Sequence, residues 1–151
     1  YDLIFGPAYK GIPLAAAVAT SLAARGRDLG FAYNRKEVKD HGEGGVLVGA
    51  SVQGRRVVII DDVLTAGTAL RQAVALVREH GGDPVAAVIA LDREERGNGA
   101  LSAVQEAEAE LGLRVIPLVS VREVMSYLQS KGLEPGAIDA MRQYQQTYGI
   151  S

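Results

Sequence analysis

Short apolar runs alternate with amphipathic segments along the whole chain. Runs rich in β-branched residues predict strands, and apolar positions at helical spacing predict helices. Strands are predicted at residues 2–5, 29–34, 46–50, 57–60, 85–91 and 115–119. Helices are predicted from about Pro13 to Ala24, Thr68 to His80, Ala100 to Leu111, 121 to 131 and 135 to 148. This alternation is typical of an α/β domain in which helices flank a central, mostly parallel sheet.

Two of the predicted strands carry further information about their position. Residues 57–60 are β-branched throughout, which predicts a strand buried on both faces. Pro117 has no N–H to donate, so the strand around it is expected at an edge of the sheet. The 151 residues suffice for one ordinary domain, and the sequence contains no internal repeat or linker. We therefore expect a single core domain over residues 1–151.

Composition narrows the class of protein. Hydrophobic residues make up 48% and charged residues 23%, which is ordinary for a globular domain. The formal net charge of −2 gives no basic footprint for nucleic acid. The absence of cysteine excludes disulfides, thiolate metal sites and a cysteine nucleophile. Apolar runs fall well short of the roughly 20 residues of a membrane helix, so we expect a cytoplasmic protein with no membrane partner.

The most informative segment is residues 57–68, Val-Val-Ile-Ile-Asp-Asp-Val-Leu-Thr-Ala-Gly-Thr. Asp61 and Asp62 end a buried strand, and a turn of small residues from Thr65 to Thr68 then opens a helix. Successive backbone N–H groups and a helix N-terminus favour an anion there. Carboxylates beside a phosphate cradle suit a ligand that also offers hydroxyl groups, as a sugar phosphate does. The alternative is that the two aspartates only cap the turn.

Two further segments fall at predicted carboxyl ends of strands, where open α/β sheets bind ligands. Residues 6–11 read Gly-Pro-Ala-Tyr-Lys-Gly. The glycines permit a ligand to approach the backbone closely and Lys10 adds a positive charge, which together suit a pyrophosphate. Arg93 follows the strand 85–91, and its planar fork suits a carboxylate. An ordinary turn and a surface arginine are the alternatives for these two segments.

Residues 35–45 form a charged, glycine-ended segment. It contains three permanently positive side chains, Arg35, Lys36 and Lys39, and the titratable imidazole of His41. Only Val38 is apolar, so little would hold the segment against a core. We expect a flexible loop that closes over a polyanion, excludes water and places positive charge beside a leaving group. A solvated hairpin tip is the alternative.

Residues 57–68 resemble the phosphoribosyl pyrophosphate (PRPP) motif of the type I phosphoribosyltransferases. Residues 34–45 resemble the catalytic loop of orotate phosphoribosyltransferases, and the likeness extends to residues 6–11 and 91–97. The resemblance implies a type I phosphoribosyltransferase fold with a mobile loop over the site. It also implies transfer of the phosphoribosyl group of PRPP to orotate, giving orotidine 5′-monophosphate and pyrophosphate in pyrimidine synthesis.

The same resemblance assigns roles to individual residues. Catalytic roles fall to Lys39, His41, Asp61 and Asp62, with Lys39 as the key contact to the leaving group. PRPP contacts are assigned to Tyr9, Lys10, Arg35, Lys36, Lys39, His41, Asp61, Asp62, Val63, Leu64, Thr65, Ala66, Gly67, Thr68 and Ala69. Thr65 and Arg93 are assigned to orotate. Mg²⁺ is implied as the cofactor, held mainly by substrate oxygens and water. A homodimer that shares the loop between subunits is implied as well.

The beginning of the chain departs from the family pattern. Tyr1 is not an initiator methionine, and the first strand runs at once into a functional-looking loop. We expect an N-terminal part that carries further orotate contacts to be missing.

Three other functions compete with this interpretation. A phosphoribosyltransferase for another base would differ in the loop at residues 34–45. A non-catalytic PRPP sensor would lack that loop or carry a DNA-binding module. A flavodoxin-like or Rossmann binding module would carry glycine fingerprints that the sequence lacks.

Overall fold

A computed structural model of the protein describes residues 1–39 and 45–150. Six strands and five helices are found in these residues. The strands are β1 (Leu3–Gly6), β2 (Gly30–Lys39), β3 (Gly45–Gly49), β4 (Arg56–Val63), β5 (Asp83–Asp92) and β6 (Arg114–Ser120). The helices are α1 (Gly11–Ala24), α2 (Thr68–Glu79), α3 (Ala103–Leu111), α4 (Val121–Ser130) and α5 (Pro135–Tyr148). Every strand and helix predicted from the sequence is therefore present, with differences at their ends.

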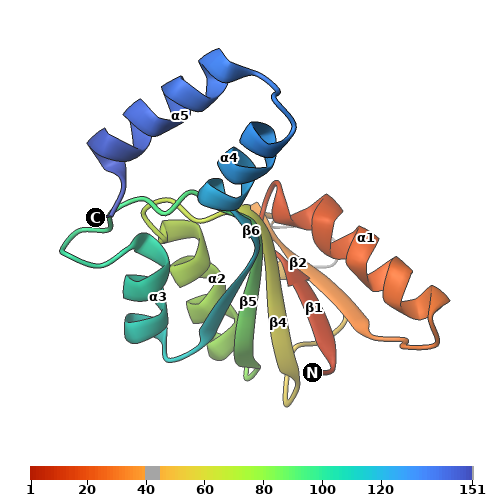
Figure 1. The fold of residues 1–151 in the computed structure, drawn as a ribbon. Helices are drawn as coiled ribbons and strands as arrows, with labels where there is room; N and C mark the ends of the chain where they lie inside the picture. The colour runs from red at the N-terminus through yellow and green to blue at the C-terminus, as the bar shows by residue number, and fades with distance from the viewer. Residues whose placement is uncertain (40–44, 151) are drawn as a thin grey trace.

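All six strands join one sheet in the order β3-β2-β1-β4-β5-β6. Neighbouring strands run parallel except β2 and β3, which are antiparallel. Helix α1 covers one face, α2 and α3 cover the other, and α4 and α5 lie beyond the carboxyl end of the sheet (Figure 1). The prediction of a mostly parallel sheet between helices is confirmed, as is the edge position of the strand that contains Pro117.

Alternation along the central strands divides the core into two clusters. Successive side chains of a strand point to opposite faces of the sheet. Leu3 and Phe5 belong to the cluster under α2 and α3, whereas Ile4 lies in the cluster under α1. Strand β4 behaves in the same way, with Val57 and Ile59 facing α2 and α3. Residues 57–60 are buried on both faces, as their β-branched sequence predicts.

The strand order fixes where a ligand can bind. Strands β2 and β3 follow β1 in the chain and extend the sheet in one direction. Strands β5 and β6 follow β4 and extend it in the opposite direction. Strands β1 and β4 are parallel neighbours at the point where this direction reverses. The turns that follow them therefore lie side by side at the carboxyl edge, which is where open α/β sheets bind ligands.

The structure corrects the first part of the loop expected at residues 35–45, and residues 40–44 lie outside the described residues. Residues 35–39 continue β2 as one arm of a hairpin, and Lys39 aligns with Gly45 of β3. The ladder pairs Asn34 with Leu47 and next Lys39 with Gly45, so residues 35–38 lie opposite a single residue of β3. The register shifts between Asn34 and Lys39, which marks an irregularity in the arm. His41 lies outside the described residues.

Two other element ends differ from prediction. Helix α3 begins at Ala103 rather than Ala100, because Ser102 and Gln105 form a capping box that sets its first turn. Strand β4 continues to Val63, so both aspartates lie within the strand rather than after it. Among the helices of the described residues, none has the length and apolar character needed to cross a membrane.

Candidate active site

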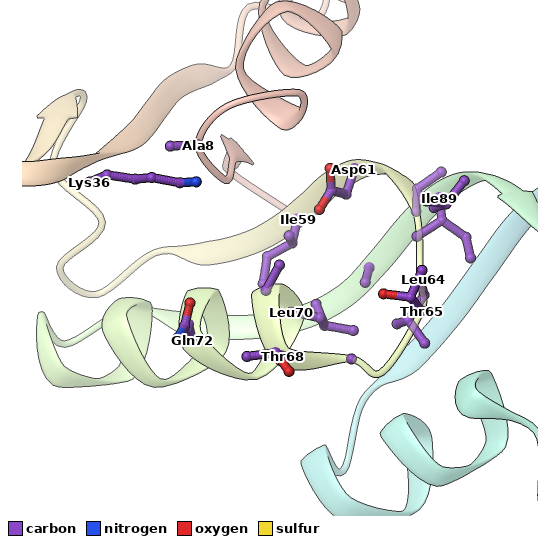
Figure 2. Close-up of a pocket in the computed structure, with 15 residues that line it drawn as sticks. Ala8, Lys36, Ile59, Asp61, Leu64, Thr65, Thr68, Leu70, Gln72 and Ile89 are labelled. Carbon is purple, nitrogen blue, oxygen red and sulfur yellow. The ribbon is translucent and has the colours of Figure 1, made fainter. Parts of the chain in front are cut away.

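Asp61 and Asp62 stand near the carboxyl end of β4, where the strand leaves the core. The Asp61 side chain is half-buried and points into a cavity between the end of β4 and the start of α2 (Figure 2). Asp62 pairs with Lys10, whose Nζ lies 2.9 Å from Asp62 Oδ2. The N–H of Asp62 also donates to Asp61 Oδ1 at 2.9 Å. The two carboxylates are thus adjacent in the chain and have different surroundings.

These surroundings move the two pKa values apart. Burial raises the pKa of Asp61, and the negative charge of Asp62 adds to that effect. Burial also acts to raise the pKa of Asp62, but its hydrogen bonds with Lys10 and with the N–H of Val63 outweigh it and lower that pKa. The hydrogen bond to Asp62 raises the pKa of Lys10. Asp62 is therefore the more acidic carboxyl group of the pair.

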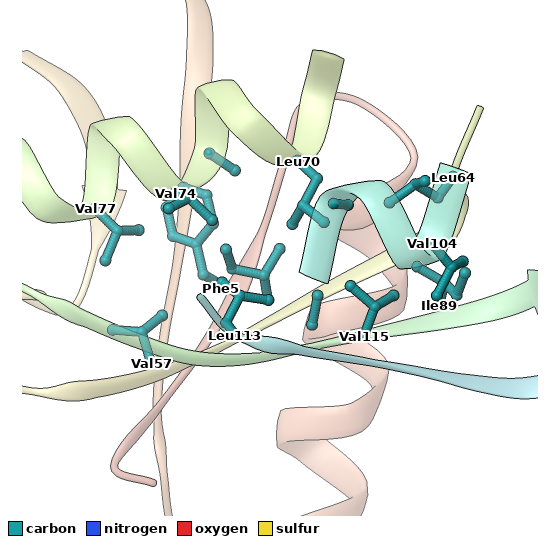
Figure 3. Packing of buried hydrophobic residues seen from close by; sticks show 14 of the residues in the cluster. Phe5, Val57, Leu64, Leu70, Val74, Val77, Ile89, Val104, Leu113 and Val115 are labelled. Carbon is teal, nitrogen blue, oxygen red and sulfur yellow. The ribbon is translucent and has the colours of Figure 1, made fainter. Parts of the chain in front are cut away.

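The turn from Thr65 to Thr68 lies between two buried anchors, and all of its residues except Gly67 are exposed. Leu64 and Leu70 pack in the core cluster under α2 and α3 (Figure 3), while the side chains of Thr65 and Thr68 remain exposed. Gly67 caps the N-terminus of α2 with φ of 73°, a conformation that favours glycine. The first backbone N–H groups of a helix lack partners within the helix, so this turn offers donors to an anion.

Arg71 fixes this turn from the side. Its guanidinium donates to the backbone carbonyl of Ala66 and pairs with Glu110 on α3 at 2.7 Å. Long side chains on a helix lean toward its N-terminus, which lets Arg71 reach back to the preceding turn. The turn is thereby tied to a second helix.

A cavity of about 320 Å³ joins several of the predicted site residues. Asp61, Thr65 and Thr68 line one part of it, and Lys36 and Ala8 reach it from the other side (Figure 2). The remaining predicted residues that line it are Val63, Leu64, Gly67 and Ala69. One cavity thus receives residues from the turn after β1, from β2, from β4 and from the start of α2.

The turn after β1 is held against β2. The N–H of Ala8 donates to Asn34 Oδ1 at 3.0 Å. Lys36 Nζ lies 4.6 Å from the centre of the exposed Tyr9 ring, a cation–π distance. Tyr9, Lys10 and Lys36 therefore gather at one end of the sheet, and Lys10 bridges to β4 through Asp62.

Arg93 follows the end of β5 and is not part of the lining of the cavity. Its Nε lies 2.9 Å from Glu95 Oε1, and its Nη2 donates to Glu95 Oε2 at 3.1 Å. The backbone carbonyl of Arg93 accepts a hydrogen bond of 2.7 Å from Gln145 on α5.

Comparison with known proteins adds independent information. The phosphoribosyl transferase domain family matches residues 1–100. An orotate phosphoribosyltransferase of Halorhodospira halophila is 53% identical over 152 residues, covering 100% of this chain and 71% of that protein. The corresponding enzyme of Marinobacter nauticus is 51% identical over 150 residues, 99% of this chain and 70% of that protein. This chain belongs to the orotate phosphoribosyltransferase family.

Solved structures of the family agree with the fold. The crystal structure of orotate phosphoribosyltransferase from Francisella tularensis has a TM-score of 0.79 and 35% identity, covering 99% of this chain and 68% of that one. A complex of the Mycobacterium tuberculosis enzyme with PRPP has a TM-score of 0.66 and 28% identity, covering 82% and 64%. The type I phosphoribosyltransferase fold expected from the sequence is confirmed, and a flavodoxin-like or Rossmann module is excluded.

The orotate phosphoribosyltransferase fold brings most, but not all, of the predicted site residues together. Arg35 lies half-buried on β2 next to Lys36. Ala66 is exposed in the turn after β4, outside the lining of the cavity. The backbone of Lys39 ends β2, but its side chain and the whole of His41 lie outside the described residues. The predicted roles of Lys39 and His41 therefore remain predictions.

The sequence did not single out three residues that organise the site. Asn34 holds the turn after β1, Arg71 holds the turn after β4, and Glu95 holds Arg93. Arg71 could have been found from its place four residues after Gly67, on the first turns of a helix that begins at a phosphate-type loop. No local signal identifies Glu95, because its other contact comes from α5.

Proposed function

We propose that this chain transfers the 5-phosphoribosyl group of PRPP to orotate, giving orotidine 5′-monophosphate and pyrophosphate. The observation that carries the proposal is that Asp61, Thr65 and Lys36 line one and the same cavity. It offers an acidic group for hydroxyls, an amide-rich turn for a phosphate and a cation for a second phosphate. This combination suits a sugar that carries phosphate groups at both ends.

The 5′-phosphate binds the turn from Thr65 to Thr68 in this proposal. The N–H groups of the first turn of α2, the two threonine hydroxyls and the positive end of the helix dipole all favour a dianion. The buried side chains of Leu64 and Leu70 support the assignment because they anchor both ends of the turn. A rigid turn holds its donors in place without reorganisation during the reaction.

Asp61 and Asp62 accept hydrogen bonds from the ribose hydroxyls in this proposal. The described residues include no group of three or more His, Cys, Asp or Glu side chains that could hold a metal ion. Asp61 and Asp62 supply hard oxygen atoms beside the ribose, and Mg²⁺ prefers such oxygens together with substrate phosphates. These two residues fit a Mg²⁺ ion held mainly by substrate oxygens and water, which when bound neutralises charge on the pyrophosphate.

Positive charge surrounds the proposed place of the pyrophosphate. Lys10 and Lys36 lie at this end of the sheet with Tyr9, and Arg35 is adjacent on β2. Lys39 and His41 are assigned to the same group, with Lys39 beside the leaving oxygen. The anomeric centre gains oxocarbenium character as the pyrophosphate leaves, so the enzyme contributes mainly by positioning and electrostatics.

Orotate is assigned to Arg93 and Thr65. Arg93 follows the strand next to β4, and its guanidinium can bind a planar carboxylate in a bidentate way. Thr65 lies at the rim of the cavity. We also propose that the protein is a homodimer that shares the loop at residues 35–45 between its subunits, and that it works in the cytoplasm.

A direct assay tests the function. The loss of orotate absorbance is measured in the presence of PRPP and Mg²⁺, with uracil, adenine and hypoxanthine as competing bases. We expect consumption of orotate alone, with release of pyrophosphate. Asp61→Asn should lower the rate strongly, and the matched surface variant Asp139→Asn should not. Binding of PRPP without turnover of any base would support the sensor, and turnover of another base would reassign the substrate.

A further inference from the structure

Glu95 occupies one edge of the Arg93 guanidinium. Its Oε2 accepts a hydrogen bond from Nη2 at 3.1 Å, and its Oε1 lies 2.9 Å from Nε, an ion-pair contact in which the buried Nε makes no hydrogen bond within the described residues. A guanidinium has five N–H donors, and this pair uses the side that carries Nε. The opposite edge, formed by Nη1 and the second N–H of Nη2, is the one that can meet a ligand in a bidentate way.

Glu95 is itself held by the last helix. The hydroxyl of Tyr144 donates to Glu95 Oε1 at 2.6 Å. The neighbouring Gln145 donates to the backbone carbonyl of Arg93 at 2.7 Å. Consecutive residues of α5 thus fix both the main chain of Arg93 and the carboxylate that orients its side chain. The Glu95 side chain is only 15% exposed, so water competes little for these bonds.

Backbone contacts extend this connection. The N–H of Arg96 donates to the carbonyl of Tyr148 at 2.8 Å, and the N–H of Ile150 donates to the carbonyl of Glu94 at 3.1 Å. The segment after β5 and the end of α5 are therefore joined as a short antiparallel pair. The position of the Arg93 guanidinium therefore depends on helix α5, which has no other part in the proposed site.

We propose that Glu95, held by Tyr144, is a positioning residue that aims Arg93 at the carboxylate of orotate. The inference rests on the proposed function, because it takes Arg93 as the orotate contact. A free arginine side chain loses considerable rotamer entropy when it binds, and a fork already held by Glu95 loses less. Glu95 therefore affects the affinity for the base and leaves the PRPP contacts unchanged.

The test compares Glu95→Gln and Tyr144→Phe with the unmodified protein in steady-state assays. A glutamine keeps the shape but removes the negative charge and turns one N–H donor toward the guanidinium, which disrupts the ion pair. We expect Glu95→Gln to raise the KM for orotate about tenfold and to change the KM for PRPP less than twofold. Tyr144→Phe should shift the orotate KM in the same direction by about threefold. Glu79→Gln and Tyr127→Phe, both on exposed positions, are the matched controls.

A double-mutant cycle separates positioning from a general loss of structure. In an Arg93→Ala background, Glu95→Gln should lower kcat/KM for orotate by less than about twofold, because its only route to the base is gone. An equal rise in both KM values, an unchanged orotate KM, or a full effect of Glu95→Gln without Arg93 would each overturn the inference. Should the unmodified protein not consume orotate at all, the proposed function fails instead, so the two failures are distinguishable.

Discussion

Lys10 Nζ lies 2.9 Å from Asp62 Oδ2, so a cation from the turn after β1 neutralises a carboxylate at the end of β4. The pair joins the two strands at which the sheet changes direction. It also leaves Asp61 as the carboxylate that faces the cavity. In the proposed complex Lys10 exchanges this partner for the pyrophosphate, and Asp62 turns to a ribose hydroxyl.

Replacing Lys10 tests this exchange. We expect Lys10→Met to raise the KM for PRPP about tenfold, the effect of losing one hydrogen bond to a charged group. The KM for orotate should stay within twofold. Lys131→Met, at an exposed position after α4, is the matched control. An unchanged PRPP KM would remove Lys10 from the pyrophosphate group.

The two aspartates should titrate in a fixed order. Because burial raises the pKa of Asp61 and the Lys10 pair helps to lower that of Asp62, Asp61 takes up its proton first as the pH falls. Carboxyl carbon chemical shifts of labelled aspartate would follow both steps. Asp62→Asn removes a like charge and should move the Asp61 midpoint to lower pH. Protonation of Asp62 before Asp61 would contradict the electrostatic account.

Gly67 is predicted to matter for both stability and substrate binding. Its φ of 73° strains any residue with a side chain, and an added Cβ would lie 2.7 Å from Arg71 Nη1, so the guanidinium that holds the turn has to shift. Gly67→Ala should cost about 1–2 kcal/mol of folding free energy, the penalty of a left-handed backbone. Gly26→Ala, at φ of 79° after α1 and with open space around it, should cost a similar amount.

Gly67→Ala should raise the KM for PRPP, and Gly26→Ala should leave it unchanged. Chemical denaturation measures the folding free energy, and steady-state kinetics measures the KM. A normal PRPP KM for Gly67→Ala would show that the turn does not bind the phosphate.

Much of this architecture follows from sequence patterns alone. The β-branched run at residues 57–60 and the small-residue turn after it predict a buried strand and an exposed loop, and both are found. The hairpin arm at residues 35–39 escaped prediction because its polar sequence carries no alternating apolar pattern, although β2 continues to Lys39. Glu95 escaped because its Tyr144 partner is 49 positions away and only the tertiary fold brings them together.

Lys39 is expected to act on the chemical step. Charge placed beside the leaving pyrophosphate stabilises the transition state more than bound PRPP, so Lys39→Ala should lower kcat by about 10²–10³-fold. The dissociation constant of PRPP should change far less. Rapid-quench kinetics would separate the two, and an unchanged kcat would assign the leaving-group contact to another residue.

Mixing two inactive variants tests whether the loop at residues 35–45 is shared. If the loop of one subunit serves the site of its partner, a heterodimer with one Lys39→Ala subunit and one Asp61→Asn subunit keeps one intact site. An equal mixture that exchanges subunits should then recover about a quarter of the unmodified activity. No recovery after verified exchange would contradict a shared site.

In the proposed complex, main-chain amides from Thr65 to Thr68 bind a sugar 5′-phosphate. Amide chemical shifts of ¹⁵N-labelled protein, followed during titration with ribose 5-phosphate and separately with ribose, test it most directly. We expect large, saturable shifts of the amide signals of residues 65–68 with ribose 5-phosphate, and no shifts of these signals with ribose. Shifts confined to the turn at residues 7–10, or equal responses to both sugars, would contradict it.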